Sequence, residues 1–348
     1  MDLNQRASSS SPIRIAINGY GRIGQCVLRA LYESVHRNAI QIVAINELSD
    51  IDTIAYLTRY DSTHGRFPLL VETSNSQLLI DGDAIEILCE EDPTNLPWTA
   101  LEVDVVLECT GVYGSRADAE RHLHAGAKRV LFSHPAESDV DRTVVFGVND
   151  SELQASDRIV SNASCTTNAI VPVLKTLHQS FGVEAGNLTT IHSAMNDQPT
   201  IDAYHHRDLR RTRSAMQNLV PVDTALAKGV ERLLPELRDK LSAVAMRVPT
   251  VNVSALDLSV YVSKATSREE VNEALSIAAQ NQFKGVLAYT QEPLASTDFN
   301  HDSRSAIVDG SQTRVTQGKL VKVLTWFDNE WGFANRMLDV TLAWFNRG

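Results

Sequence analysis

The sequence has little of several features that would mark other classes of protein. Its 348 residues include only four cysteines and no C-x-x-C pair, which argues against a disulfide framework and a thiolate-rich zinc site. No apolar run approaches the roughly 18 residues of a membrane-spanning helix. The net charge of -11 opposes binding to nucleic acid or to an anionic membrane. We therefore expect a cytoplasmic protein with no metal site and with neither nucleic acid nor membrane as a partner.

The length and the 43% hydrophobic content are sufficient for about two domains. Residues 1–12 have little to bury and are expected to form a flexible leader. After them, strand patterns alternate with helix patterns up to about residue 164, which predicts an α/β domain. The predicted strands are 13–18, 40–46, 77–80, 85–88, 103–109, 129–132, 143–146 and 158–161, and the predicted helices are 23–34 and 115–125.

The pattern changes after residue 164. Longer apolar strands are predicted at 243–248, 256–262 and 319–327, together with a helix at 268–279, so the second domain is expected to be rich in sheet. Residues 330–346 have apolar side chains at helical spacing, which predicts a terminal helix that packs on the body of the protein.

A glycine-rich turn lies between the first predicted strand and helix. Residues 19–24 read GYGRIG, in which Gly19 makes the tight turn, Gly21 admits a pyrophosphate and Gly24 brings the helix close to the strand. Glu47 ends the next strand, where a carboxylate accepts the ribose hydroxyls of NAD and repels a 2′-phosphate. An ordinary βα turn is the alternative. The residues assigned to the cofactor are Gly19, Gly21, Arg22, Ile23, Gly24 and Glu47.

Cys165 stands in the polar run SNASCTTN, immediately before an apolar helical pattern at 169–177. The positive end of a helix dipole favours the thiolate form of a cysteine, which makes Cys165 a candidate nucleophile. His192 ends another strand-like run and is the candidate base. The alternatives are a small buried cysteine and a structural histidine. Pro172 is expected near the early turns of the helix, where it costs least.

Arginines suggest where an anion binds. Arg207, Arg210, Arg211 and Arg213 occur within seven residues, and a planar guanidinium grips phosphate through two donors. A solvated loop or a subunit contact is the alternative for any one of them. Arg247 ends an apolar strand and is expected to have a charged or hydrogen-bonded partner.

Four segments together resemble the glyceraldehyde-3-phosphate dehydrogenase family, in order and in spacing. They are NGYGRIG at 18–24, SNASCTTN at 161–168, MRVPT at 246–250 and DNEWG at 328–332. Within that family the chain looks most like the members that oxidise D-erythrose 4-phosphate, through INEL at 45–48, YDSTHGR at 60–66, IHSAM at 191–195 and VDG at 308–310.

The resemblance implies a Rossmann NAD-binding domain at 13–164, an α+β catalytic domain with a mostly antiparallel sheet at 165–328, and a C-terminal helix at 329–348 that packs back on the NAD-binding domain. It implies a homotetramer. By the same resemblance Cys165 is the nucleophile, His192 its base, and Asn329 the partner of the nicotinamide carboxamide. The residues it places at the substrate are Ser164, Thr166, Arg211, Thr224 and Arg247.

Three positions depart from the phosphorylating members of the family. Met195 and Asp197 stand where threonine hydroxyls are usual, and a carboxylate repels a phosphate ligand. Ala225 stands where a glycine is usual and adds a methyl group to the second anion pocket. These departures predict weakened use of inorganic phosphate.

The leading hypothesis is therefore NAD-dependent oxidation of D-erythrose 4-phosphate to 4-phospho-D-erythronate through a cysteine thioester that water hydrolyses, a step the resemblance assigns to pyridoxal phosphate biosynthesis. The first alternative is phosphorylating oxidation of glyceraldehyde 3-phosphate. The second is an NAD-responsive binding or redox-sensing protein in which Cys165 is oxidised; a base beside the thiol argues against it.

Overall fold

The computed structural model describes residues 11–204 and 208–347, so most of the predicted leader and the segment His205–Arg207 lie outside the described residues. The chain divides into two compact units. Unit 1 comprises residues up to Val144, Asn149–Ser164 and Ala334 onwards, and unit 2 comprises Val145–Val148 and Cys165–Phe333. Within the described ranges, no helix combines the length and the apolar character needed to cross a lipid bilayer.

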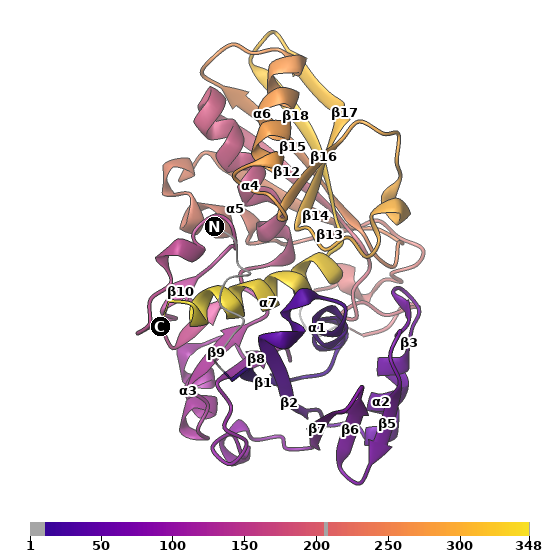
Figure 1. Cartoon of the computed structure of the whole chain (residues 1–348). Helices are drawn as coiled ribbons and strands as arrows, with labels where there is room; N and C mark the ends of the chain where they lie inside the picture. The colour runs from indigo at the N-terminus through magenta and orange to yellow at the C-terminus, as the bar shows by residue number, and fades with distance from the viewer. Residues whose placement is uncertain (1–10, 205–207, 348) are drawn as a thin grey trace. The chain divides into compact units, whose positions relative to one another are not determined.

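Unit 1 is built on a nine-stranded sheet in the order β10-β11-β9-β8-β1-β2-β7-β6-β5 (Figure 1). The strands from β10 to β7 run parallel, and the hairpin of β7, β6 and β5 is antiparallel. The strands are β1 (Ile13–Asn18), β2 (Ile40–Asn46), β5 (Val71–Ser74), β6 (Gln77–Ile80), β7 (Asp83–Leu88), β8 (Val105–Glu108), β9 (Arg129–Phe132), β10 (Arg142–Thr143) and β11 (Ile159–Ser161). This is the doubly wound Rossmann arrangement that was predicted.

Side-chain caps begin two helices of unit 1, and a glycine turn precedes another. α1 (Arg22–Tyr32) follows the glycine turn, and α3 (Arg116–His124) begins at a capping box formed by Ser115 and Asp118. α2 (Ile51–Arg59) begins at the Asp50 cap and leads into a two-stranded hairpin, β3 (Tyr60–Asp61) and β4 (Gly65–Arg66). The sequence analysis did not anticipate α2 or this hairpin.

Polar side chains tie together the carboxyl ends of three neighbouring strands in unit 1. Asn46 at the end of β2 donates to Asn18 at the end of β1 at 2.7 Å, and Asn18 donates to Glu108 at the end of β8 at 2.6 Å. Glu108 also lies 3.1 Å from His122, whose other ring nitrogen accepts from Trp98. Because all of these groups are buried and paired, they fix the sheet edge at which the strand order reverses.

Unit 2 is a seven-stranded sheet in the order β13-β14-β12-β15-β18-β17-β16. β14 is parallel to β12 and β16 to β17, and the other neighbours are antiparallel, as the fold class predicted. The strands are β12 (Val183–His192), β13 (Val220–Val222), β14 (Leu241–Arg247), β15 (Ser254–Val262), β16 (Leu287–Thr290), β17 (Ala306–Thr316) and β18 (Leu320–Phe327).

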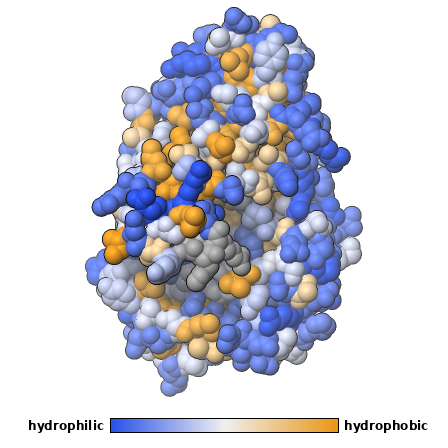
Figure 2. Space-filling model, turned by 180° about the vertical axis from the view of Figure 1, so that it is seen from behind, coloured by the Kyte–Doolittle hydropathy of each residue, from blue (hydrophilic) through white to orange (hydrophobic). Residues whose placement is uncertain are grey.

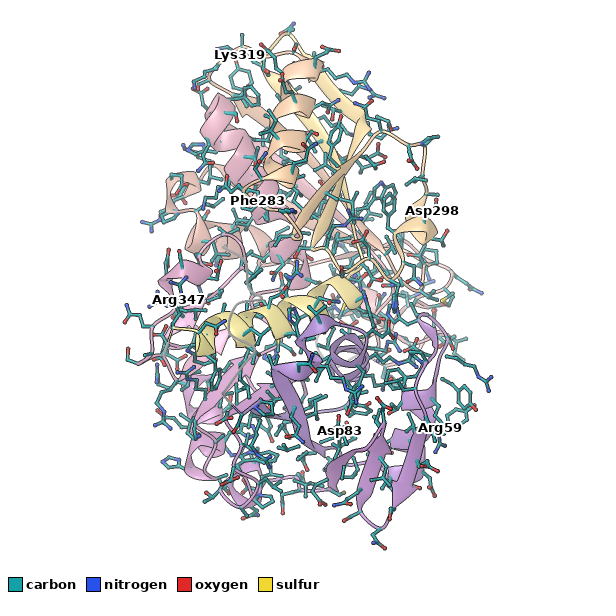
Figure 3. All side chains as sticks on the ribbon, viewed as in Figure 1. Arg59, Asp83, Phe283, Asp298, Lys319 and Arg347 are labelled. Atoms are coloured by element: carbon teal, nitrogen blue, oxygen red, sulfur yellow. The ribbon has the colours of Figure 1, made fainter. Side chains whose placement is uncertain are left out.

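The helices of unit 2 are α4 (Cys165–Phe181), α5 (Leu226–Leu233) and α6 (Arg268–Gln280) (Figure 1). They contribute with the sheet to one apolar core, which includes Leu174, Val230, Leu275 and Phe283, the last labelled in Figure 3. One prediction is wrong. Pro172 lies in the interior of α4, not in its first turn, so it removes one backbone donor from a buried helix.

The last helix, α7 (Trp331–Phe345), begins in unit 2, and its residues from Ala334 onwards belong to unit 1. Within unit 1, Asp339 lies 3.0 Å from His36, and the Arg129 guanidinium lies over the ring of Trp344. Figure 2 shows a face on which hydrophilic side chains predominate and apolar ones form small groups, in keeping with the charged composition.

Candidate active site

Cys165 is the first residue of α4, at the place that the sequence analysis predicted. Ala163, two residues before it, has φ of 56°, a left-handed conformation that a non-glycine residue seldom adopts. This reversal carries the chain directly into the helix. The Cys165 sulfur lies 3.8 Å from the Thr166 hydroxyl and 3.8 Å from Nε2 of His192.

His192 is the last residue of β12, an interior strand of the sheet, and is 7% exposed. Its Nδ1 lies 2.9 Å from the backbone oxygen of Ser193. A carbonyl oxygen can only accept a hydrogen bond, so Nδ1 carries the ring proton and donates it. The lone pair of Nε2 therefore faces the Cys165 sulfur, which is the orientation that a base requires.

Burial disfavours the charged form of both members of this pair. It raises the pKa of the Cys165 thiol, although hydrogen bonds at Thr166 and the charge of Arg247 act in the opposite direction. Burial and the charge of Arg247 lower the pKa of His192 to about 4. Desolvation therefore acts against the thiolate that the helix terminus was expected to favour. Both directions favour a thiol beside a neutral imidazole in the unliganded pair.

Arg247 ends β14 beside the end of β12, since its register partner across the two strands is His192. Its Nη2 lies 3.9 Å from Asp197, and its Nη1 donates to the Ser193 carbonyl at 3.5 Å. The same carboxylate of Asp197 accepts from Arg211 at 2.9 Å. Asp197 thus lies between the two arginines that the sequence analysis assigned to anions.

The other described arginines of the cluster, Arg210 and Arg213, do not join this group. Arg213 pairs with the exposed Asp202 at 2.9 Å, Arg210 is exposed, and Arg207 is outside the described residues. The hydroxyl of Thr224 accepts from the Leu226 amide at 3.2 Å, at the start of α5. Among the described residues, no hydrogen bond links Thr224 to the cysteine and histidine.

Asn329, two residues after the end of β18, is linked to the same group by two serines. Its Oδ1 accepts from Ser193 at 3.0 Å and from Ser254 at 2.8 Å. The sequence analysis found Asn329 and missed both serines. The position of Ser193 directly after His192 was the only signal for it, and Ser254 carried none.

The glycine turn of unit 1 has the shape that a dinucleotide requires. A Cβ at Gly19, which has φ of 89°, would lie 2.6 Å from the Thr110 nitrogen, and a Cβ at Gly24 would lie 2.4 Å from the Gly19 oxygen. A Cβ at Gly21 would meet nothing within 4 Å, and no side chain caps α1 there. The space at Gly21 therefore lets a pyrophosphate approach the N-terminus of α1, which begins with Arg22 and Ile23.

The charges around the turn also fit NAD. Glu47 accepts from the amides of Tyr20 at 2.7 Å and Leu48 at 2.8 Å, which holds its carboxylate beside the turn. The guanidinium of Arg22 is forked on Asp61 at 2.6 and 3.2 Å, and Arg59, labelled in Figure 3, donates to the Val71 oxygen. Both basic side chains near the turn are thus committed to the protein rather than to a 2′-phosphate.

Comparison with known families agrees with this description of the two units. Residues 13–116 match the family model described as glyceraldehyde 3-phosphate dehydrogenase, NAD binding domain. Residues 164–329 match the model described as glyceraldehyde 3-phosphate dehydrogenase, C-terminal domain. Together the two matches cover more than half of the chain, and the first supports NAD as the cofactor.

The contrast between Gly21, where an added Cβ would meet open space, and Gly24, where it would overlap backbone, gives a first prediction. Gly21→Ala is expected to leave the free energy of unfolding nearly unchanged, because its Cβ enters open space, but to weaken NAD binding about tenfold or more, because that space admits the pyrophosphate. Gly24→Ala is expected to cost about 1–3 kcal/mol of stability, because its Cβ overlaps backbone. Denaturant unfolding and calorimetric titration with NAD measure both. Equal effects of the two substitutions on stability would contradict the geometry.

The raised pKa of the Cys165 thiol gives a second prediction. The rate at which iodoacetamide alkylates Cys165 in the unliganded protein should still rise with pH above 9, because only the thiolate reacts and the pKa of the thiol is raised. Mass spectrometry of the Cys165 peptide separates this rate from that of the exposed Cys89. His192→Asn should show the same rise. A plateau between pH 5 and 8 that this substitution abolishes would instead demonstrate a resting thiolate–imidazolium pair.

Proposed function

The chain belongs to the glyceraldehyde 3-phosphate dehydrogenase family and is an NAD-dependent dehydrogenase, and on this premise we propose that it oxidises D-erythrose 4-phosphate to 4-phospho-D-erythronate. The reaction passes through a thioester on Cys165 that water hydrolyses. The observation that carries the covalent route is the 3.8 Å approach of the Cys165 sulfur to the unprotonated Nε2 of His192.

The first half of the reaction joins the substrate to the protein. The Cys165 sulfur attacks the aldehyde carbon, a sulfur–carbon bond forms, and Nε2 of His192 takes the thiol proton. The protonated imidazole and the Cys165 amide then stabilise the negative oxygen of the hemithioacetal. Bound NAD supplies the acceptor for the hydride that leaves this carbon, and the oxidised product is a thioester on Cys165.

The second half releases the acid. His192, after returning its proton to solvent, takes a proton from a water molecule that attacks the thioester carbon. The carbon–sulfur bond breaks, and the leaving sulfur takes up a proton to restore the thiol. Asn329, which keeps two amide protons free, is the group that we assign to the nicotinamide carboxamide.

Arg247 is the residue that we assign to the substrate phosphate. Its separation of 3.9 Å from Asp197 is a loose contact, whereas Arg211 is held at 2.9 Å by Asp197 and at 3.5 Å by Asp208. Arg247 is therefore more available than Arg211 to bind the substrate phosphate. A phosphate there would also offset the positive charge that lowers the pKa of His192, so that substrate binding brings the base nearer to its working range.

The two carboxylates beside Arg211 support water rather than phosphate as the second nucleophile. Two carboxylates, from Asp197 and Asp208, already compensate this guanidinium. A free phosphate would have to displace them or approach against their negative charge. Met195, which is 43% exposed, offers the ligand no donor. The homotetramer implied by the resemblance stays a prediction.

The substrate is tested by comparing aldehydes. Purified protein with NAD should oxidise erythrose 4-phosphate faster than glyceraldehyde 3-phosphate, and added inorganic phosphate should not raise either rate. Absorbance of the reduced cofactor measures both. Cys165→Ala should abolish turnover, because the covalent route has no other nucleophile, while NAD binding is retained. A preference for glyceraldehyde 3-phosphate with strict dependence on phosphate would assign the phosphorylating reaction instead.

Asp197 provides a test of the second nucleophile. Asp197→Asn keeps the size of the side chain and removes one of the two charges that compensate Arg211, so inorganic phosphate should raise turnover about tenfold in this variant. Asp202→Asn is the matched control, because it releases Arg213, which lies outside the group. If inorganic phosphate raises the turnover of neither variant, Asp197 does not exclude phosphate from the site.

A further inference from the structure

Asn329 is held in a rigid turn between β18 and α7. The carboxylate of Asp328, the preceding residue, accepts from the backbone amides of Glu330 at 3.0 Å and Trp331 at 2.8 Å. It also accepts from the His301 amide at 2.8 Å and from Nδ2 of Asn252 at 2.9 Å. These four bonds to a buried carboxylate fix the backbone of the turn, but they leave the rotation of the Asn329 amide undetermined.

The rotation is determined by two buried hydroxyls. Ser193 and Ser254, which are 0% and 1% exposed, both donate to Oδ1 of Asn329, at 3.0 and 2.8 Å. The Ser254 oxygen itself accepts from the Ser193 amide at 3.1 Å, so its only proton remains for Asn329. The two lone pairs of the amide oxygen are thereby occupied by two donors.

This arrangement leaves Asn329 with one kind of hydrogen-bonding group to offer. Nδ2 makes no hydrogen bond to any residue in the part of the chain that the structure describes, and the side chain is 8% exposed. What Asn329 presents to a ligand is therefore a pair of N–H donors with no acceptor beside them. Such a group selects an oxygen acceptor and rejects a ligand that turns an N–H toward it.

Ser193 has separate roles for its hydroxyl and its backbone. Its carbonyl oxygen accepts from Nδ1 of His192 at 2.9 Å and from Arg247 at 3.5 Å, while its hydroxyl serves Asn329 alone. A substitution that removes only the hydroxyl keeps the bonds to the base and to the arginine. A Ser193→Ala substitution therefore separates the effect on Asn329 from effects on His192 and Arg247.

We propose that Ser193 and Ser254 are positioning residues that lock the Asn329 amide with its N–H groups outward, so that the protein recognises the carbonyl oxygen of the nicotinamide carboxamide and fixes the rotation of that carboxamide. The proposal rests on the assignment of Asn329 to the nicotinamide. Without the two hydroxyls, the Asn329 amide can turn by half a revolution and direct its oxygen at the ligand oxygen.

The test is a comparison of binding between NAD and two analogues. Thionicotinamide adenine dinucleotide has a sulfur in place of the carboxamide oxygen and is a poor acceptor. The 3-acetylpyridine analogue keeps the carbonyl oxygen and lacks the amide protons. Calorimetric dissociation constants, measured without any aldehyde, should show the thio analogue about tenfold weaker than NAD for the unsubstituted protein and the acetyl analogue close to NAD.

Removal of either hydroxyl should erase most of this discrimination. In Ser193→Ala and in Ser254→Ala, the ratio of the two dissociation constants for the thio analogue and NAD should fall to about two, because the Asn329 amide no longer has a fixed orientation. Alkylation of Cys165 should proceed at an unchanged rate in Ser193→Ala, because the carbonyl that holds His192 remains. Thermal unfolding of both variants shows whether they fold, and either one suffices for the comparison.

Ser305→Ala is the matched control. Ser305 is 4% exposed, belongs to unit 2, and its hydroxyl has no hydrogen-bond partner among the described residues. This variant should keep the tenfold ratio. The proposal is overturned if a folded Ser193→Ala or Ser254→Ala variant discriminates as well as the unsubstituted protein does. Because these measurements need only the dinucleotides, a wrong choice of aldehyde substrate would leave their outcome unaffected.

Discussion

Burial of one thiol and one imidazole is the constraint on which the chemistry of unit 2 depends. Desolvation disfavours the charged form of each group, which raises the pKa of Cys165 and lowers that of His192. The bond from Nδ1 to the Ser193 carbonyl places the unprotonated Nε2 toward Cys165. Local hydrogen bonding therefore sets which ring nitrogen can accept the thiol proton.

Charge compensation is the second organising feature of the site. Arg247 and Arg211 would form a strongly cationic pocket if they stood alone, but Asp197 lies between them. The same guanidinium of Arg247 also affects the pKa of both Cys165 and His192. Anion binding and proton transfer are thus coupled through one side chain, and the acidic residue that discourages a free phosphate is part of the same electrostatic group.

The elements that the sequence predicted well are those with a strong local pattern. β1, β2, β9, α3 and α6 lie within one or two residues of their predicted bounds, because short buried strands and capping residues are visible in the sequence. The sequence analysis missed α2, although Asp50 caps it and Ile51, Ile54 and Ala55 stand at helical spacing. Pro172 was expected near the early turns of α4, but the helix begins at Cys165 and Pro172 lies in its interior.

By itself the sequence determined the order of the elements, the glycine turn and the identity of the residues at the site, since these follow from periodicity, from the need for glycine at close approaches and from motif spacing. The tertiary structure alone decided the raised pKa of Cys165, the ion pair of Arg22 with Asp61, the position of Asp197 between two arginines and the hydrogen bonds of two serines to Asn329. Burial and hydrogen bonds between residues distant in the chain produce these properties, and neither can be read from local sequence.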